Sequence, residues 1–245
     1  MKGKAKVVSA GAAVLAVFFG TVAIARESVV FVCAHPDDLG GCSGTAMLLA
    51  EKFDVHVIDY THGERGLGEA QCRDGSCRAM RTKEEERACA LVPAQLHWME
   101  VIDGEADATM ENCRKLADLL RAINPRAVIA HWPLDLHLDH AMSSVATLKA
   151  IELAKLKPEV YFQEQPHQTR SFQPVLYVPI TSVKGRKDML IDCYSCQGPE
   201  AMKRRKTQDA VFRGRAIGRD FAEAFAVMGN TVRGRGVLDE IGAVR

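Results

Sequence analysis

The feature that most constrains the fold is a regular alternation of strand-like and helix-like segments. Apolar runs such as SVVFVCA (residues 28–34) and DVHVIDYT (54–61) are typical of buried strands, whereas ENCRKLADLLRAI (111–123) repeats leucine and isoleucine at helical spacing. Strand and helix alternate four times up to residue 156. This alternation predicts βαβ units with right-handed crossovers, and hence an α/β fold with a mostly parallel sheet.

The later part of the chain changes character. Residues 159–165 and 174–181 have the composition of strands, and residues 184–196 and 198–228 are predicted to be helical. The sequence contains no internal repeat and no obvious second-domain boundary. Its 245 residues suit one domain with a sizeable core.

The charges of the chain are balanced. The 32 basic and 31 acidic residues give a net charge of +1, which provides no global field to attract nucleic acid, so we expect no nucleic-acid partner. The run KRRK (Lys203–Lys206) is a local basic cluster. We interpret it as a solvated helix face, with an anion-binding or partner site as the alternative.

Residues 1–25 resemble a targeting segment. MKGKAK carries three lysines, the following VVSAGAAVLAVFFGTV is apolar or small throughout, and AIA (23–25) offers the small residues that a signal peptidase needs. The pattern predicts a signal peptide, a mature start near Arg26 and a secreted or periplasmic protein. The alternative is an uncleaved N-terminal membrane anchor, because the apolar run approaches membrane-spanning length. We expect membrane contact only through such an uncleaved segment.

The eight cysteines are compatible with export. Cys72 and Cys77 flank a turn-like RDGS and could close a small disulfide loop, while Cys193 and Cys196 form a C-x-x-C motif. Disulfides are the favoured interpretation in an oxidising compartment. A zinc site made from the two pairs is the alternative, although the spacing of the first pair is unusual for one.

Polar side chains collect where the predicted strands end. HPDD (35–38) follows the first strand, THGERG (61–66) the second, Asp103–Gly104 the third, and HWPLDLHLDH (131–140) the fourth. In parallel sheets, ligands bind beyond the carboxyl ends of the strands. We therefore expect these groups to meet at one edge of the sheet.

Two of these segments carry groups that bind metals. His35 and Asp38 lie on a predicted turn, and His137 and His140 are three residues apart at a predicted helix start, where they can share a face. Asp37 and Asp38 should point apart, so that one can bind a metal while the other faces a water. A His/Asp/His set leaves zinc one or two open positions, the form of a catalytic site. The pattern favours a metal hydrolase with a free carboxylate as general base.

These motifs together resemble the LmbE/PIG-L family of deacetylases. AHPDD, THGERG and HLDH carry the resemblance, and RTKE (81–84), KDMLIDCYSCQ (187–197) and AEAF (222–225) follow in the family's order. The resemblance implies an LmbE-like domain over residues 26–245, folded as a Rossmann-like three-layer sandwich. The chain departs from the family where Leu39 directly follows HPDD, in place of a glutamate common in relatives.

The resemblance also implies an activity. It suggests a zinc-dependent hydrolase, with Fe²⁺ as another divalent metal such a site accepts, that removes an N-acetyl group from an N-acetylglucosamine-type sugar or conjugate. The substrate would be a small-molecule amino sugar. His35, Asp38 and His140 match the family's metal ligands, and Asp37 matches its general base.

Three further residues match functional positions of the family. His137 matches the histidine that stabilises the oxyanion or protonates the leaving amine. Asp139 is placed to orient a histidine. Arg81 matches a position associated with substrate hydroxyl groups.

Other functions compete with this one. The chain could be a family amidase that cleaves a larger thiol-sugar or natural-product amide. A non-catalytic carbohydrate-binding relative is disfavoured because the matched ligands are all present. A Rossmann nucleotide-binding protein is disfavoured because no G-x-G-x-x-G follows the first strand.

Overall fold

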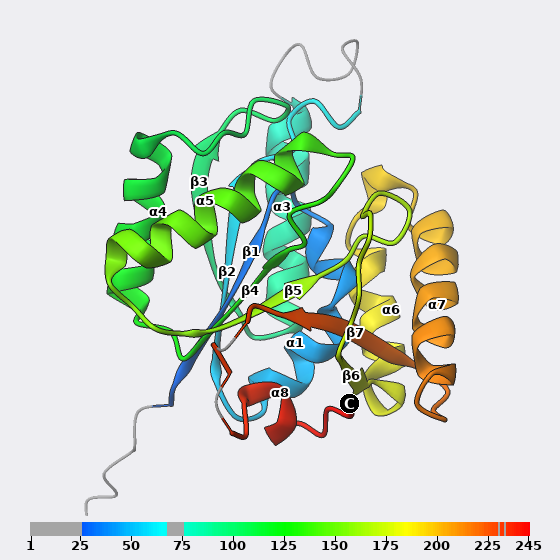
Figure 1. Ribbon diagram of the computed structural model, residues 1–245. Helices are drawn as coiled ribbons and strands as arrows, with labels where there is room; N and C mark the ends of the chain where they lie inside the picture. The colour runs from blue at the N-terminus through cyan, green and yellow to red at the C-terminus, as the bar shows by residue number, and fades with distance from the viewer. Residues whose placement is uncertain (1–25, 68–75, 230, 233) are drawn as a thin grey trace, which may run out of the picture.

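The computed structural model describes residues 26–67, 76–229, 231–232 and 234–245, which build a seven-stranded sheet with helices on both faces (Figure 1). The strand order is β3-β2-β1-β4-β5-β7-β6. The strands from β3 to β5 in this order are parallel, whereas β7 runs antiparallel to β5 and β6. The strands are β1 (Ser28–Cys33), β2 (Asp54–Thr61), β3 (Gln95–Val101), β4 (Ala127–His131), β5 (Glu159–Gln163), β6 (Leu176–Pro179) and β7 (Ala222–Val227).

The helices form the two outer layers. Helices α4 and α5 cover one face of the sheet, and α1, α3, α6 and α7 cover the other (Figure 1). The α-helices are α1 (Ser43–Ala50), α3 (Ser76–Leu91), α4 (Met110–Ile123), α5 (Leu138–Ala154), α6 (Lys184–Asp192), α7 (Pro199–Arg215) and α8 (Val237–Glu240). The short 3₁₀ turns are η1 (Asp38–Gly41), η2 (Thr181–Val183) and η3 (Ser195–Gln197).

Strand β1 shows why the apolar runs predicted buried strands. Val29 and Phe31 pack into the core under α1 and α6, whereas Val30 and Val32 pack into the core under α4 and α5. All four side chains are buried because helices cover both faces of the sheet. The predicted α/β fold, a three-layer sandwich with a mostly parallel sheet, is confirmed.

One predicted helix is wrong in part. Residues 198–228 were expected to be helical throughout, but α7 ends at Arg215 and Ala222–Val227 form β7. Gly218, with φ of 65°, lies in the turn between them. The alanines of AEAFAV suit a helix, yet pairing with β5 and β6 decides the structure, because β propensity depends on the neighbouring strands.

The N-terminal prediction lies outside the described residues. Residues 1–25, predicted to be a signal peptide or anchor, are not described, so the domain start near Arg26 stays a prediction. Among the residues that are described, no helix is both long and apolar enough to cross a membrane.

Candidate active site

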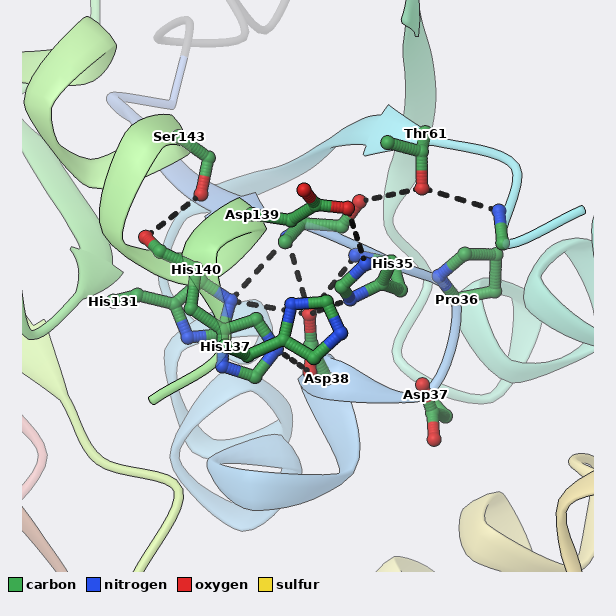
Figure 2. A network of polar contacts seen from close by, with 12 residues as sticks. His35, Pro36, Asp37, Asp38, Thr61, His131, His137, Asp139, His140 and Ser143 are labelled. Atoms are coloured by element: carbon green, nitrogen blue, oxygen red, sulfur yellow. Dashed lines mark hydrogen bonds and ion pairs between the residues drawn. The ribbon is translucent and has the colours of Figure 1, made fainter. Parts of the chain in front are cut away.

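The HPDD segment forms a tight turn at the carboxyl end of β1. Asp37 adopts φ of 98°, an uncommon conformation for a residue with a side chain, and is the N-cap residue that precedes η1. Asp38 turns back, and its Oδ2 accepts hydrogen bonds from the backbone N–H groups of Ala34 (3.1 Å) and His35 (2.9 Å). The turn therefore sends the two neighbouring carboxylates in different directions, as the sequence led us to expect (Figure 2).

Asp38 lies at the centre of a histidine cluster. Its Oδ2 lies 3.1 Å from His131 Nε2, and its Oδ1 lies 3.3 Å from His140 Nε2 (Figure 2). Gln165 Nε2 lies 3.2 Å from the Asp38 carbonyl oxygen, to which it donates. Burial alone would raise the pKa of Asp38, but His140 and His131 hold that pKa well below its usual range. The lowered pKa favours the ionised form of Asp38, which is the form that binds a metal ion.

His35 is held between carboxylates. Its Nδ1 lies 3.4 Å from Asp38 Oδ2, while its Nε2 lies 3.0 Å from Asp139 Oδ2 and 3.2 Å from Asp103 Oδ1. Asp139 is itself fixed by the backbone N–H of Gly104, at 2.7 Å. Burial lowers the pKa of His35, but these carboxylates outweigh it and raise that pKa well above its usual value.

His140 and His137 both come from the start of α5. His140 Nε2 faces Asp38, and its Nδ1 lies 3.3 Å from Asp135 Oδ1. Burial opposes protonation of His140, but Asp38 and Asp135 raise its pKa to about 9. The His137 ring lies 4.6 Å from the His35 ring and 4.8 Å from the His140 ring, measured between centroids. Burial and these two rings lower the pKa of His137.

The donor atoms fit a divalent metal ion. Three groups of side chains have ligand atoms within 4.8 Å of one another: His35, His137 and His140; Asp38, His131 and His140; and His35, Asp103 and Asp139. The predicted ligands His35, Asp38 and His140 each belong to at least one of these groups, which share His35 and His140, although no single group contains all three. A carboxylate faces the second ring nitrogen of both histidines, which is typical of metal-binding histidines because it fixes their tautomer.

Asp37 lies apart from the histidine cluster (Figure 2). Its Oδ1 accepts a hydrogen bond from Arg81 Nη2 at 2.9 Å, and its backbone N–H donates to Glu85 Oε2 at 3.2 Å. Burial raises the pKa of Asp37 to about 6, against the lowering effect of the Arg81 guanidinium. Such a carboxylate is ionised at neutral pH and can still take up a proton.

Arg81, predicted to contact substrate, is only 4% exposed. Its guanidinium also donates to the carbonyl oxygens of Pro36 and Gly63. It packs so closely on the THGERG loop that a Cβ on Gly63 or Gly66 would lie 2.3 Å from Nη1. Arg81 lines the cleft, but its resolved contacts are with the HPDD turn and this loop. A contact with substrate stays a prediction.

A cleft of about 220 Å³ opens over these groups. One side holds the predicted residues His35, Asp37, Asp38, His137 and His140. The other side comes from the segment after β5 and from α7, through residues to which sequence reasoning gave no role in the site. These are Gln165, His167, Gln168, Met202, Arg205 and Lys206.

Two glutamates of the motifs lie outside the cleft and connect the elements around it. Glu84 of RTKE accepts from Ser195 Oγ at 2.5 Å and from the backbone N–H of Cys196 at 2.9 Å, which ties α3 to η3. Glu223 of AEAF accepts from Lys187 Nζ at 2.6 Å and from the N-terminus of α1.

Among the described residues, the C-x-x-C motif takes part in no disulfide. Cys193 and Cys196 are both free thiols, and Cys196 Sγ lies 2.9 Å from Glu84 Oε2. Cys72 lies outside the described residues, so the predicted Cys72–Cys77 loop stays a prediction.

The fold and the site together define an LmbE-like α/β protein with a metal-competent His/Asp cluster at the carboxyl edge of its sheet. Residues 30–151 match the family model described as PIG-L: GlcNAc-PI de-N-acetylase. The chain belongs to the PIG-L (LmbE-like) family, which confirms the resemblance found in the sequence. Members of this family are enzymes and are typically metal-dependent.

Similar proteins include enzymes of two kinds. The 4-oxalmesaconate hydratase of Pseudomonas putida KT2440 is 27% identical over 210 residues, covering 77% of this chain and 80% of the hydratase. The structure of N,N'-diacetylchitobiose deacetylase from Pyrococcus horikoshii has a TM-score of 0.74 at 23% identity, covering 82% of this chain and 84% of that one. GalB, the 4-carboxy-2-hydroxymuconate hydratase of P. putida KT2440, has a TM-score of 0.77 at 24% identity, with coverages of 85% and 99%. The two structures share the fold with this chain.

Proposed function

We propose that the protein is a metal-dependent amide hydrolase that removes an N-acetyl group from an N-acetylglucosamine-type amino sugar or conjugate. One observation carries the proposal: the His35, Asp38 and His140 donor set shares a cleft with a separate carboxylate, Asp37. Amide hydrolysis needs both parts, because the water must be activated and a base must take its proton. The match to a de-N-acetylase family model supports the choice of acyl group.

We assign the metal to His35, Asp38 and His140, and propose zinc. When bound, zinc lowers the pKa of a coordinated water to about 7 and polarises a carbonyl. Asp139 and Asp103 face the far nitrogen of His35, and Asp135 faces that of His140. These carboxylates orient the two rings so that His35 Nδ1 and His140 Nε2 are directed at the Asp38 carboxylate.

Asp37 acts as the proton carrier. Arg81 occupies its Oδ1, which leaves Oδ2 to accept a proton from the attacking water. A pKa of about 6 keeps the carboxylate ionised at neutral pH. Once protonated, the same carboxyl group is acidic enough to pass its proton to the leaving amine.

His137 stabilises the oxyanion. It is half-buried at the rim of the cleft, and the lowering of its pKa by burial and by His35 keeps the imidazole neutral near pH 7. A neutral imidazole retains one N–H, which can donate to the oxygen that gains negative charge.

Release of acetate from N-acetylated amino sugars by the metal-loaded protein tests the proposal. A panel with larger acyl groups on the same sugars would detect the alternative amidase activity. Release of no acyl group from any member, by protein shown to contain metal, would refute amide hydrolysis.

A second candidate is hydration of an unsaturated acid. Identity of 27% to 4-oxalmesaconate hydratase over most of both chains favours it. The same groups would serve. Asp37 would take the proton of a water that adds to one carbon of a carbon–carbon double bond, and its protonated carboxyl group would return that proton to the other carbon. Consumption of 4-oxalmesaconate without acetate release from any amide would select this function.

A further inference from the structure

The cleft contains a buried lysine that forms no ion pair among the described residues. Lys206 of α7 is 7% exposed and lines the cleft. Its only hydrogen-bond partner in the described part of the chain is the amide oxygen Oε1 of Gln165. A buried ammonium is costly unless a negative group accompanies it, and an amide oxygen supplies no charge.

The neighbouring Lys187 shows what a compensated lysine looks like in this fold. Lys187 is 1% exposed, and its Nζ lies 2.6 Å from Glu223 Oε1. That pair is satisfied on all sides, because Glu223 also accepts from the backbone N–H groups of Gly44 and Thr45, at 3.0 and 2.7 Å. Burial and the nearby charge of Lys187 lower the pKa of Lys206, and the more distant carboxylates of Asp38, Asp37 and Asp209 raise it without reversing that direction. An anion in direct contact with the ammonium would add to their effect.

The basic run on α7 divides into two parts. Lys203 is engaged at the surface, where its Nζ lies 2.7 Å from both Asp192 and Glu200. Arg205, next to Lys206, also lines the cleft, is exposed, and forms no ion pair within the described residues. Two basic side chains that lack a direct ion pair in the described part of the chain therefore line the same cleft.

Lys206 lies close to the candidate metal ligands. Gln165 connects it to Asp38, since the Gln165 Oε1 accepts from Lys206 while the Gln165 Nε2 donates to the carbonyl oxygen of Asp38 at 3.2 Å. One amide side chain thus separates Lys206 from a candidate metal ligand. A small molecule in a cleft of about 220 Å³ can reach both.

We propose that Lys206 and Arg205 bind an anionic group of the substrate, so that the enzyme acts on acidic derivatives of an amino sugar in preference to neutral ones. The inference rests on the proposed function, because that function supplies the amino-sugar amide of the substrate. The anionic group is what the inference adds. The anionic group is a carboxylate or a phosphate, since an ammonium and a guanidinium bind the oxygens of either.

Paired probes test this charge requirement. The carboxylate pair is N-acetylmuramic acid and its methyl ester, and the phosphate pair is N-acetylglucosamine 6-phosphate and N-acetylglucosamine. Calorimetric titration of each into the metal-loaded Asp37→Asn protein measures binding without turnover. At least one anion should bind about 10- to 100-fold more tightly than its neutral partner, the range expected for charge-assisted hydrogen bonds. The pair with the larger ratio identifies the anion.

Variants of the basic run separate recognition from structure. In the same background, Lys206→Met and Arg205→Gln should each bring the ratio of anion to neutral binding towards 1. Lys203→Met and Arg204→Gln, drawn from the same run, should keep it. A merely structural role for Lys206, through Gln165, would weaken both members of a pair alike and leave the ratio unchanged.

Three results would overturn the inference: equal binding of both members of each pair, a preference that survives in Lys206→Met and Arg205→Gln, or no binding of any probe. A preference that survives would mean that the anion contacts the metal instead. Acetate release by protein with Asp37 intact is measured separately. If no acetate is released but the anion preference is preserved, deacetylation is rejected while the proposed anion site is supported.

Discussion

Arg81 Nη2 lies 2.9 Å from Asp37 Oδ1 and donates a hydrogen bond to it. The same buried guanidinium donates to the carbonyl oxygens of Pro36 and Gly63. The Arg81 guanidinium therefore holds the candidate base, Asp37, and is itself fixed by the backbone of the HPDD turn and of the THGERG loop. This arrangement opposes the effect of burial on Asp37, and so sets the pH range in which its carboxylate is ionised.

Replacing Arg81 should shift the pH dependence of the reaction. Burial raises the pKa of Asp37 to about 6 while Arg81 lowers it, so Arg81→Met should raise that pKa further, by about one unit or more. The base works only when ionised, so activity is present above this pKa and is lost as pH falls through it. The acid limb of kcat/KM should therefore move to higher pH.

Acetate release measured from pH 5 to 9 would show the shift, and Arg81→Lys should recover part of it. Arg78→Met is a matched control, because Arg78 lies on the same helix but pairs with Glu100 at the surface. If Arg81→Met lowers the rate equally at every pH, Arg81 acts in substrate contact and not on the base.

Much of the fold was predictable because the information is local. Strands β1, β2, β4 and β5 are short apolar runs that helices on both faces keep buried, so the runs alone located them. Strand β3, at the edge of the sheet, is mostly half-buried and was located by its place between two helical segments. Strand β7 was missed because its character comes from its neighbours. Its Glu223 can be buried because Lys187, 36 residues earlier, forms an ion pair with it and the N-terminus of α1 donates two hydrogen bonds to it.

The candidate site was predictable to the extent that single motifs carry it. HPDD and HLDH identified His35, Asp38 and His140, which the fold brings together. His131 was overlooked, although it ends β4, because its contact with Asp38 spans 93 residues. The same applies to Lys206, whose run suggested a solvated face, because only the packing of α7 shows which of its charges reach the cleft.

Asp37→Asn should abolish most of the activity without loss of the metal. The amide cannot accept the proton of the attacking water, so kcat should fall about 10²- to 10⁴-fold, the usual contribution of a general base. Metal analysis should give the same stoichiometry as the unmodified protein, because Asp37 is not among the clustered donors. Full activity in this variant would remove Asp37 from the mechanism.

Removal of metal should reduce both activity and stability. Chelation should abolish acetate release, and added Zn²⁺ or Fe²⁺ should restore it. A metal present at 100 times its Kd stabilises the fold by about 2.7 kcal/mol, so Tm should fall after chelation. Asp38→Ala and His140→Ala should lose the metal. His167→Ala, which alters the same cleft outside the donor groups, should keep it. Metal retention by both ligand variants would contradict the assignment.

Glu85→Gln should remove a pH-dependent weakness of the fold. Burial raises the pKa of Glu85 to about 7, so the folded protein binds a proton there more tightly than the unfolded chain does. That contribution is fully present below the unfolded pKa, near 4.5, and is lost as pH rises through 7. Between pH 5 and pH 8, the Tm of the unmodified protein should therefore fall relative to the Tm of Glu85→Gln. A difference that is constant with pH would show that Glu85 is ionised throughout.

Gly63→Ala should damage the base through Arg81. Gly63 has φ of 62°, and an added Cβ would lie 2.3 Å from Arg81 Nη1, so the variant combines backbone strain with displacement of the guanidinium. We expect a loss of about 1–3 kcal/mol in the free energy of unfolding. The acid limb of kcat/KM should also move to higher pH, as in Arg81→Met.

Gly185→Ala is the control, because Gly185 lies within α6 and no described atom lies within 4 Å of its added Cβ. That variant should gain about 0.4–1 kcal/mol and keep the pH profile. An unchanged profile in Gly63→Ala would mean that the THGERG loop does not hold Arg81 against Asp37.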